Sequence, residues 1–496
     1  MAFKSDRSFL DKLTMGALGT TYAKNVLMYH GHKVIELERC STSNKIWSTK
    51  VKRLRIPDLL CVNCGRRMEV RSKSTLKITM SDSPSIPHRR WDYGLRDDDL
   101  VLLIACNKDL HTSNWVPSSA INAFTVGDLR ATVHLSRLGP PKSAAEGAER
   151  DRTWPCYVPS FGGQVIEVKP EFISVRKVNG RRQTYSLVRA GYHPHVFRGQ
   201  TFEPDSVIAA SVVPRLADLS CHVDKPFDFI ANLAATDRET LYCAVKALGR
   251  LPEAGKAAIS HLLRIAGGGT DDQLVRLEAY ASLARLGYAR AWKGISTFLQ
   301  SGSPEVRMEA VLILGELNDP AAQSILSDIA SNHANDSELR AAAVWEMGHC
   351  RFDNPLNQLL PYFGDDDHFV AIHAIVASLP YINAETLPFL LQELGPPHRS
   401  AAVVRAIVES NFRDVNLLVD YLFRISTEAQ KPWILYLFGL LGEEVVRPAL
   451  VGHGKEEDET AQMLSILWNQ HFHNWTNEFS AQDLLDYTLR QNIRGT

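Results

Sequence analysis

The spacing of apolar residues in the first hundred positions predicts an α/β arrangement. Residues 10–29 are mostly apolar with helical spacing, and Gly31 follows at a position typical of a helix C-terminus. The stretch 32–39 (HKVIELER) predicts a strand, and residues 56–61 and 66–74 predict a hairpin around the short turn 62–65. The unbroken apolar run from Leu100 to Cys106 predicts a strand that is buried on both faces.

After residue 107 the pattern weakens, and LGPPKSAAEGAERDR (138–152) is typical of a flexible connector. Beyond it, two alternating runs flank Asn179-Gly180, a strong short-range signal for a hairpin. This predicts a small β-rich module from residue 153 to residue 215. The basic residues beside its turn are candidate contacts for nucleic acid, although an ordinary exposed hairpin carries the same residues: Arg176, Lys177, Arg181 and Arg182.

The C-terminal half contains an internal repeat. Apolar helix stripes with small residues recur between residues 244 and 444, and several end at a glycine: Gly249, Gly287, Gly315 and Gly348. These glycines are 38, 28 and 33 residues apart, and periods of this size with paired helices indicate an α-solenoid. The segment SPEVRMEAVLILGELNDPAA (303–322) resembles a HEAT repeat of the short bacterial style. Because HEAT arrays bind partners on a concave face, the resemblance implies recognition or assembly, not chemistry.

These patterns predict a multidomain protein of the α/β + α class. Its expected parts are an N-terminal α/β domain (1–137), a linker (138–152), a small β-rich module (153–215), a C-terminal α-solenoid of HEAT-like repeats (216–450) and a helical cap (451–496).

Composition favours a soluble, folded chain. The 496 residues are 45% hydrophobic and 22% charged, which are ordinary values for globular proteins. The N-terminus lacks the apolar core of a signal peptide, and no stretch approaches the ~20 apolar residues of a membrane helix. We therefore expect a cytoplasmic protein with no membrane partner. In that compartment the eight cysteines are better interpreted as buried thiols or metal ligands than as a disulfide framework.

The net charge of −1 conceals a local basic excess. Between Ser41 and Thr75 there are nine basic residues and two acidic ones. Such a segment can neutralise phosphates and release counterions, although a solvated basic face is the plainer interpretation. The candidate nucleic-acid contacts are Lys50, Lys52, Arg53, Arg55, Arg66 and Arg67.

Two carboxylates and two cations stand on the predicted hairpin. Asp58 and Glu69 lie on adjacent arms, where cross-strand neighbours are ~5 Å apart, so both can share a hard divalent cation such as Mg²⁺. Glu69, Arg71 and Lys73 alternate along one strand and share a face. A metal bound there can activate water for phosphoryl transfer, and a cation can stabilise the reacting phosphate.

This stretch resembles the PD-(D/E)XK nuclease family, which includes many restriction enzymes and has an αβββαβ core. Pro57 and Asp58 match the first part of its motif and Glu69 matches the second. The resemblance implies that Asp58, Glu69 and the backbone carbonyl of Val70 bind Mg²⁺ or Mn²⁺. The third part departs from the pattern, because the lysine position is Arg71. Either Lys73 replaces the usual lysine, or Arg71 acts electrostatically, or the centre is inactive.

The same hairpin holds a half-site for zinc. Cys61-Val-Asn-Cys64-Gly has the sequence of a zinc knuckle, in which the glycine lets the turn direct two thiolates at one Zn²⁺. Closing the tetrahedron requires two more ligands. Cys40 and Cys106 are the nearest cysteines in sequence, and His88 is also available. The alternative is a pair of free, half-buried cysteines at a turn.

Together these features predict an Mg²⁺-dependent nuclease with Asp58, Glu69 and either Lys73 or Arg71 in its centre. We expect DNA in preference to RNA as its nucleic acid, and a protein partner on the solenoid. By analogy, a nuclease fused to a recognition solenoid suggests a bacterial restriction or phage-defence role. Cutting both strands of a duplex would also call for a homo-oligomer. The alternative is a non-catalytic, zinc-pinned adaptor that binds nucleic acid and scaffolds a complex.

Overall fold

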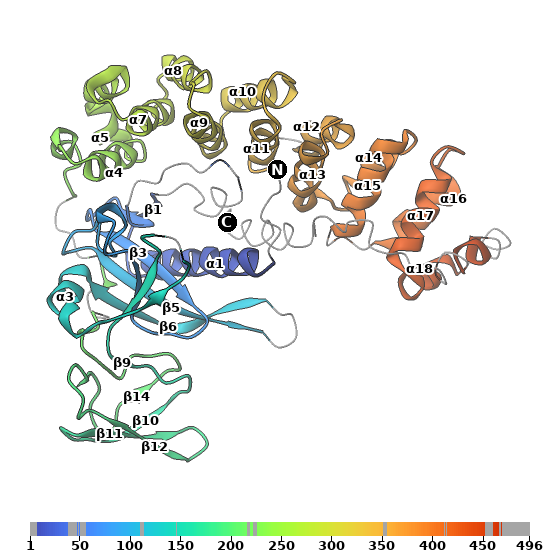
Figure 1. Cartoon of the computed structure of the whole chain (residues 1–496). Coiled ribbons are helices and arrows are strands. Elements are labelled where there is room, and N and C mark those ends of the chain that lie inside the picture. The colour runs from blue at the N-terminus through green and yellow to red at the C-terminus, as the bar shows by residue number, and fades with distance from the viewer. Residues whose placement is uncertain are drawn as a thin grey trace. The chain divides into compact units, whose positions relative to one another are not determined.

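The chain forms two compact units. The computed structural model describes residues 7–37, 47, 49, 56–109, 114–144, 146–215, 219–221, 226–350, 355–410, 412, 414–451, 460–465 and 468 (Figure 1). The first unit, here called the solenoid unit, comprises Met1–Asp11, Ile46–Lys50 and Trp292–Thr496. The second, here called the sheet unit, comprises Lys12–Lys45 and Val51–Ala291.

A five-stranded sheet forms the N-terminal part of the sheet unit. Helix α1 (Arg7–Tyr29) ends before Gly31, which has a φ of +84°. The strands then follow in chain order across the sheet: β1 (Val34–Glu36), β2 (Leu59–Cys61), β3 (Arg67–Lys73), β5 (Leu100–Lys108) and β6 (Trp115–Thr125). Strands β3 and β5 are parallel, and the other neighbouring pairs are antiparallel. The predicted helix, hairpin and buried strand are all confirmed.

Helix α1 covers one face of this sheet. Ala23 and Leu27 pack with Met68, Leu102 and other apolar residues of β2, β3 and β5. Gly19 permits the close approach, because a Cβ at this position would overlap the side chain of Ser72 on β3. Residues of β3 that alternate with Met68 and Ser72 therefore point to the other face.

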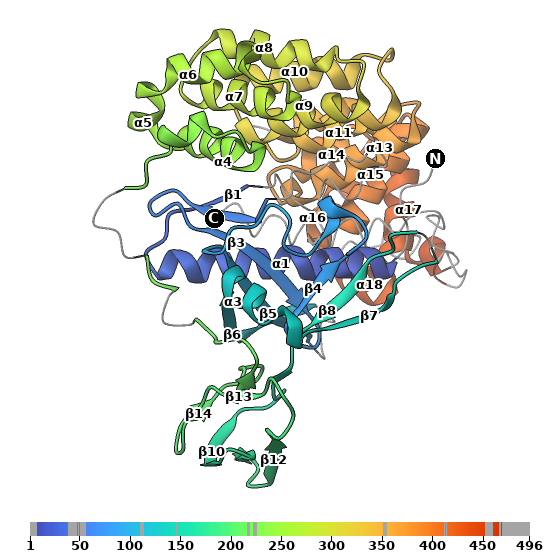
Figure 2. The same ribbon diagram turned by 60° about the vertical axis from the view of Figure 1, so that its left-hand side comes forward.

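The predicted flexible connector at 138–152 is wrong. Strands β7 (Arg137–Pro141) and β8 (Arg150–Thr153) lie within or beside it. Strand β8 pairs with β7 on one side and with β4 (Thr79–Asp82) on the other, in the order β4-β8-β7 (Figure 2). The sequence did not predict these strands because their residues are partly or fully exposed and carry no apolar alternation. Their stability comes from non-local contacts, such as the ion pair between Arg152 and Asp82 at 2.6 Å.

The second face of the sheet is covered by a separate apolar cluster. Trp91, Phe124 and Trp154 pack there with Val101 and Leu103 of β5, and Trp154 Nε1 donates to the carbonyl of Leu129 at 3.2 Å. The covering residues belong to β4, α3 (Val126–Ala131) and the 3₁₀ helix η2 (Val133–Leu135), and the exposed 3₁₀ helix η1 (Pro87–Arg89) precedes Trp91.

The predicted β-rich module is present. One sheet has the order β12-β11-β10-β14 and another β13-β15-β9. Gly180, with a φ of +80°, lies in the predicted turn between β11 and β12. The strands are β9 (Cys156–Tyr157), β10 (Gly163–Val168), β11 (Phe172–Lys177), β12 (Arg182–Ser186), β13 (His193–Pro194), β14 (Thr201–Phe202) and β15 (Ala209–Ala210).

Helical pairs follow from residue 231 onward, as the repeat predicted. In chain order the helices are η4 (Ala231–Ala234), α4 (Arg238–Leu248), α5 (Pro252–Ala257), α6 (Ile259–Arg264), η5 (Ile265–Gly269), α7 (Gln273–Arg285), α8 (Arg290–Leu299), α9 (Pro304–Leu317), α10 (Pro320–Ser331), α11 (Ser337–Met347), α12 (Pro355–Leu359), η6 (Leu360–Gly364), α13 (His368–Ser378), η7 (Leu379–Tyr381), α14 (Leu387–Gln392), α15 (Pro397–Glu409), α16 (Val415–Arg424), α17 (Lys431–Leu441) and α18 (Glu443–Leu450).

Side-chain caps and small residues define the repeat. Asp237, Asp272, Asp336 and Asp367 each accept a hydrogen bond from the first turn of α4, α7, α11 or α13. Three of the four repeating glycines lie where a Cβ would overlap the next repeat: Gly249 faces Ser282, Gly315 faces Glu346 and Gly348 faces Ala377. The glycine spacing therefore reflects close helix packing.

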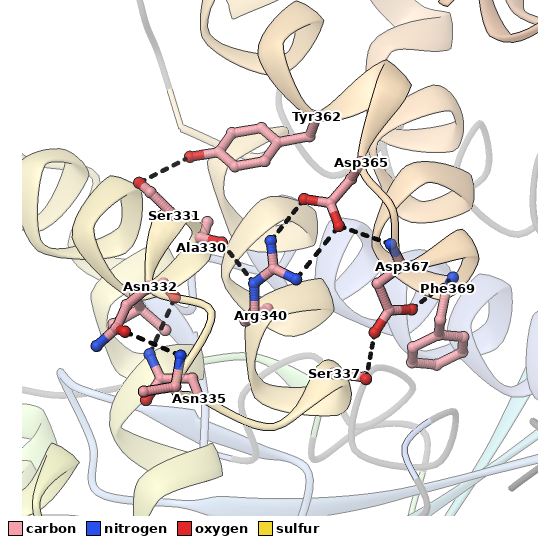
Figure 3. Close-up of polar contacts among 12 residues, drawn as sticks. Ala330, Ser331, Asn332, Asn335, Ser337, Arg340, Tyr362, Asp365, Asp367 and Phe369 are labelled. Atoms are coloured by element: carbon pink, nitrogen blue, oxygen red, sulfur yellow. Dashed lines mark hydrogen bonds and ion pairs between the residues drawn. The ribbon is translucent and has the colours of Figure 1, made fainter. Parts of the chain in front are cut away.

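An arginine links successive repeats in the solenoid unit. Arg340 of α11 lies between the end of α10 and the loop before α13 (Figure 3). Its Nε donates to the carbonyl of Ala330 at 2.8 Å, and its Nη1 donates to Asp365 at 3.2 Å. Asp367, two residues farther on, accepts from the Phe369 amide and the Ser337 hydroxyl. These bonds satisfy helix-end groups that packing alone would leave without partners.

The predicted boundary at residue 216 does not coincide with the division into units. Helices α4 to α7 belong to the sheet unit. Leu241 and Val245 of α4 share an apolar cluster with Leu60 of β2, and the buried Lys246 donates to the carbonyl of Leu37 at 3.0 Å. The first helices of the solenoid therefore complete the core of the sheet unit.

Among the described residues, no helix is both long and apolar enough to span a bilayer.

Candidate active centre and metal site

Asp58 and Glu69 are neighbours across strands β2 and β3. Leu59 lies opposite Met68 and Leu60 opposite Arg67, so the next position in this register places Asp58 opposite Glu69. The Asp58 carboxylate accepts a hydrogen bond from the backbone amide of Val70 at 2.8 Å, which fixes it against β3. Glu69 is buried, with 8% of its surface exposed. The backbone register thus puts the two predicted residues at opposed positions.

Arg71 forms an ion pair with Glu69. The Arg71 guanidinium lies 2.6 Å from Oε1 of Glu69. Lys73 is two residues farther along the strand, which moves its backbone about 6–7 Å away from that of Arg71. Burial lowers the pKa of the Lys73 ammonium, while the charge of Asp151 on β8 raises it. Of the two cations that the sequence left open, Arg71 is therefore the one that lies at Glu69, and the charge of Asp151 acts on Lys73.

Arg67 was predicted to contact nucleic acid, and the structure contradicts this assignment. Its side chain is 2% exposed, and its Nε donates to the carboxylate of Asp99 at 2.9 Å. Asp99 precedes β5, so the pair fixes the start of that strand against β3. The neighbouring Arg66 is partly exposed. The other predicted contacts lie outside the described residues: Lys50, Lys52, Arg53 and Arg55.

A second group of side chains can hold a zinc ion. His32, Cys61, Cys64 and Cys221 place one ligand atom each within 4.8 Å of one another. His32 follows helix α1, Cys61 ends strand β2, and Cys64 lies in the turn to β3. The hydrogen bond between the two thiols lowers the pKa of Cys61 and raises the pKa of Cys64, so Cys61 is the sulfur that accepts. The two predicted knuckle cysteines are thus members of the group.

Two of the other predicted zinc ligands, Cys106 and His88, do not belong to this group. Cys106 is buried within β5, where burial raises the pKa of its thiol to about 12, and it is not a member of the group. His88, in η1, is exposed and is not a member either. Cys40 lies outside the described residues. Nearness in sequence was a poor guide because His32 and Cys221 reach the turn through the tertiary fold.

Neither His32 nor Cys221 stands in a sequence pattern typical of zinc ligands. His32 directly follows Gly31, whose left-handed conformation turns the chain back from α1. Cys221 lies in a segment without strong periodicity, 160 positions after Cys61, and no sequence pattern links the two cysteines. The backbone amide of Cys221 donates to the carbonyl of His30 at 3.0 Å, so the fold aligns both ligands.

Comparisons with known proteins find HEAT repeats in the C-terminal half. The family model for HEAT repeats matches residues 269–336. Human deoxyhypusine hydroxylase in complex with glycerol is 18% identical over 49% of this chain and 94% of its own, with a TM-score of 0.21. The complex of CpcE and CpcF of phycocyanin lyase from Nostoc sp. PCC7120 is 19% identical over 45% of this chain and 97% of its own, with a TM-score of 0.22. An engineered protein is 17% identical over 54% of this chain and 77% of its own, with a TM-score of 0.24.

The sequence matches no curated protein. The match to the family model confirms the HEAT-repeat resemblance, and these comparisons provide no support for a nuclease domain in the N-terminal half.

Proposed function

We propose that the sheet unit is a divalent-metal-dependent nuclease whose centre contains Asp58, Glu69 and Arg71. The observation that carries the proposal is the cross-strand placement of the two carboxylates with a guanidinium 2.6 Å from one of them. Hydrolysis of a phosphodiester requires a cluster of hard oxygen ligands for the metal and a fixed positive charge for the phosphate. These three side chains supply both.

The order of elements supports the proposal. A helix precedes three antiparallel strands, and a further strand, β5, lies parallel to the third. This agrees with the αβββαβ core that the resemblance implies, except in the fifth element. Between β3 and β5 the chain forms β4 and the 3₁₀ helix η1 in place of an α-helix. Asp58 directly precedes the second of the antiparallel strands, β2, and Glu69 lies on the third, β3.

The donor set suits Mg²⁺ or Mn²⁺, because these ions prefer carboxylate and carbonyl oxygens. Asp58, Glu69 and the carbonyl of Val70 would hold the ion, which when bound polarises the phosphate and lowers the pKa of its water. Asp58 is already oriented by the Val70 amide. Arg71 compensates the negative charge of Glu69. A bound metal would compensate this charge instead, and the guanidinium could then neutralise a phosphoryl oxygen. Since arginine keeps its proton, Arg71 cannot serve as a general base.

A pair of exposed arginines supports a polyanionic partner. Arg176 on β11 lies directly opposite Arg182 on β12, and Gln164 on β10 lies opposite Arg176. Both arginines are exposed. Like charges at directly opposed positions destabilise a strand pair, and a bound phosphate would relieve this repulsion. We assign the exposed face with Arg176 and Arg182 to the nucleic-acid backbone.

The test is cleavage of labelled plasmid, linear duplex, single-stranded DNA and RNA with Mg²⁺ or Mn²⁺ at low salt. The variants are Asp58→Asn and Glu69→Gln. Asp58→Asn retains an oxygen that can accept the hydrogen bond from the Val70 amide, so it isolates the loss of charge. Glu171→Gln, at an exposed carboxylate beside β11, is the matched control. We expect cutting by the wild type and the control, and loss of cutting in both centre variants.

Cutting that persists in Asp58→Asn and Glu69→Gln, with unchanged circular dichroism, would remove these residues from the reaction. Absence of cutting by the wild type on every substrate would favour the second candidate function, a nucleic-acid-binding adaptor without catalysis.

The observation that favours the adaptor is that Arg71 stands where the nuclease motif has a lysine, and its ion pair with Glu69 adds to this. A guanidinium at 2.6 Å already compensates the carboxylate that a metal requires. Substitution Arg71→Lys separates the two functions, because it restores the lysine of the nuclease motif at this position. In a nuclease we expect Arg71→Lys to retain or raise Mg²⁺-dependent cutting. In an adaptor it leaves nucleic-acid binding and the absence of cutting unchanged.

The solenoid unit provides the recognition half in either case. We propose that its HEAT repeats bind a partner protein, since helical repeats of this kind present extended surfaces for partners. Pull-down with the full chain and with a variant altered at exposed solenoid residues such as Phe389 tests this role. A role in restriction of foreign DNA is a proposal by analogy with other nucleases fused to recognition modules.

A further inference from the structure

Four side chains in the sheet unit have the spacing of a tetrahedral zinc site. The sulfur atoms of Cys61 and Cys221 are 3.8 Å apart, and the sulfur of Cys64 is 3.7 Å from Nδ1 of His32. With Zn–S bonds of about 2.3 Å and Zn–N bonds of about 2.0–2.1 Å, tetrahedral geometry places two sulfurs about 3.8 Å apart and a sulfur and nitrogen about 3.6 Å apart. Both distances agree with the structure.

The histidine is oriented as a metal ligand. Nε2 of His32 lies 2.9 Å from the carbonyl oxygen of Leu219, a geometry in which Nε2 donates its hydrogen to that carbonyl. Nδ1 is then the nitrogen with the lone pair, and it is the atom that faces Cys64. Metal-binding histidines commonly donate their second nitrogen to a carbonyl in this way, which fixes the ring and its tautomer.

The backbone prepares the site from three separate segments. The turn after Cys61 is closed by the amide of Gly65, which donates to the carbonyl of Cys61 at 2.9 Å. Gly65 has a φ of +73°, and a Cβ there would overlap the ring of Phe227. The amide of Cys221 donates to the carbonyl of His30, which holds the third segment against the end of α1. These backbone contacts hold the three ligand-bearing segments together.

We propose that His32, Cys61, Cys64 and Cys221 bind one structural Zn²⁺. All four positions are filled by the protein, so the ion has no open position for water or substrate, as expected of a structural rather than a catalytic zinc. Thiolate ligands select zinc over Mg²⁺, whereas the Asp58–Glu69 pair offers only oxygens. The zinc site and the proposed nuclease centre are thus chemically independent.

The position of the site defines its role. Cys221 follows the β-rich module and precedes α4, whereas Cys61 and Cys64 belong to the hairpin whose second arm carries Glu69. Zinc would cross-link residues 160 positions apart in the chain and hold the exit from the β-rich module against this hairpin. Because such a site is absent in the unfolded chain, metal binding contributes directly to folding free energy.

The first experiment is elemental analysis of the full chain, purified without added metal or chelator. We expect about one zinc per chain. Cys221→Ala should lose the zinc, and Cys156→Ala, at a partly buried cysteine outside the group, should retain it. Zinc that persists in both Cys221→Ala and Cys61→Ala, or a wild type that holds no zinc even after incubation with ZnCl₂, would overturn the proposal.

Cobalt spectroscopy keeps the test decisive where a cysteine variant fails to fold. After replacement of zinc by Co²⁺, the wild type should show the intense visible d–d bands of a tetrahedral ion and thiolate-to-metal charge transfer. Weak bands of an octahedral ion, or a Cys61–Cys221 disulfide found by mass spectrometry of the native chain, would exclude the site. None of these readouts depends on cleavage, so failure of the proposed nuclease function would leave the zinc result unaffected.

Discussion

Trp47 stacks on His373 inside the solenoid unit, with ring centroids 5.1 Å apart and ring planes inclined by 29°. The indole is 1% exposed and also meets Phe369 edge-on at 6.3 Å. Two residues later, the amide and the hydroxyl of Thr49 donate to Glu338 of α11 at 3.1 and 2.6 Å. In sequence this segment lies between β1 and β2, and Trp47 and Thr49 anchor it among α11 and α13.

Removing this anchor should destabilise the solenoid unit. We expect Trp47→Ala to lower its free energy of unfolding by about 3–5 kcal/mol, because a large buried ring leaves a cavity. Amide hydrogen exchange in α11 and α13 should accelerate. Phe389→Ala, at a ring that is 47% exposed, is the control and should change stability by less than about 0.5 kcal/mol. Unchanged exchange in Trp47→Ala would contradict the packing of this indole against His373 and Phe369.

The stability of the solenoid unit should depend on pH through His373. Burial lowers the pKa of this imidazole from 6.5 to about 4, against smaller opposing effects of the Phe369 carbonyl, Glu338 and Asp367. Between these values the unfolded chain binds the proton and the folded unit does not, so stability should fall as the pH drops from 6.5 to about 4. The total loss would be about 3 kcal/mol.

Chemical denaturation across this pH range measures the effect. His373→Gln cannot titrate and should flatten the profile, whereas His368→Gln, at an exposed histidine on the same helix, should leave the wild-type slope intact. A profile that is equally steep in His373→Gln would assign the pH dependence to other groups.

Two adjacent arginines should respond very differently to substitution. Arg67 and Asp99 are each 2% exposed and form an ion pair, so Arg67→Ala leaves a buried carboxylate without its partner. We expect Arg67→Ala to cost about 3–5 kcal/mol of stability in the sheet unit. Arg66→Ala, at a partly exposed position, should cost less than about 1 kcal/mol. Urea denaturation monitored by fluorescence distinguishes them, and equal losses would show that the Arg67–Asp99 pair is not a buried one.

The exposed arginine pair of the β-rich module should control nucleic-acid affinity. With Arg176→Gln and Arg182→Gln combined, we expect weaker binding. The slope of the logarithm of the association constant against the logarithm of the salt concentration should become less negative by about two. The matched control, Arg290→Gln with Lys293→Gln, also removes two exposed positive charges. Fluorescence anisotropy at several salt concentrations gives both quantities. If the control weakens binding as much as the pair does, the effect is one of net charge, and the Arg176–Arg182 face is not the binding surface.

Local signals predicted much of this molecule. Helical spacing predicted α1, the Asn179-Gly180 turn predicted the β11–β12 hairpin, and the apolar run from Leu100 predicted β5. Each of these depends on interactions between residues close in sequence or on a single buried surface. The proximity of Asp58 and Glu69 was predictable for the same reason, since a short hairpin fixes the register of its two arms.

Strands β7 and β8 were not predictable, because exposed strands without alternation gain their stability from distant partners such as Asp82. The choice between Arg71 and Lys73 also depended on side-chain contact, which periodicity does not describe.

By itself, the sequence determined the helical repeats, the hairpin with its two carboxylates and the two cysteines of the knuckle, because all of these follow from neighbouring residues. Only the tertiary structure decided that His32 and Cys221 complete the group of four, that Arg67 is buried against Asp99, and that Trp47 belongs to the solenoid unit. The physical reason is that each of these contacts joins residues between 32 and more than 300 positions apart, and such closures are set by the packing of whole elements rather than by local preference.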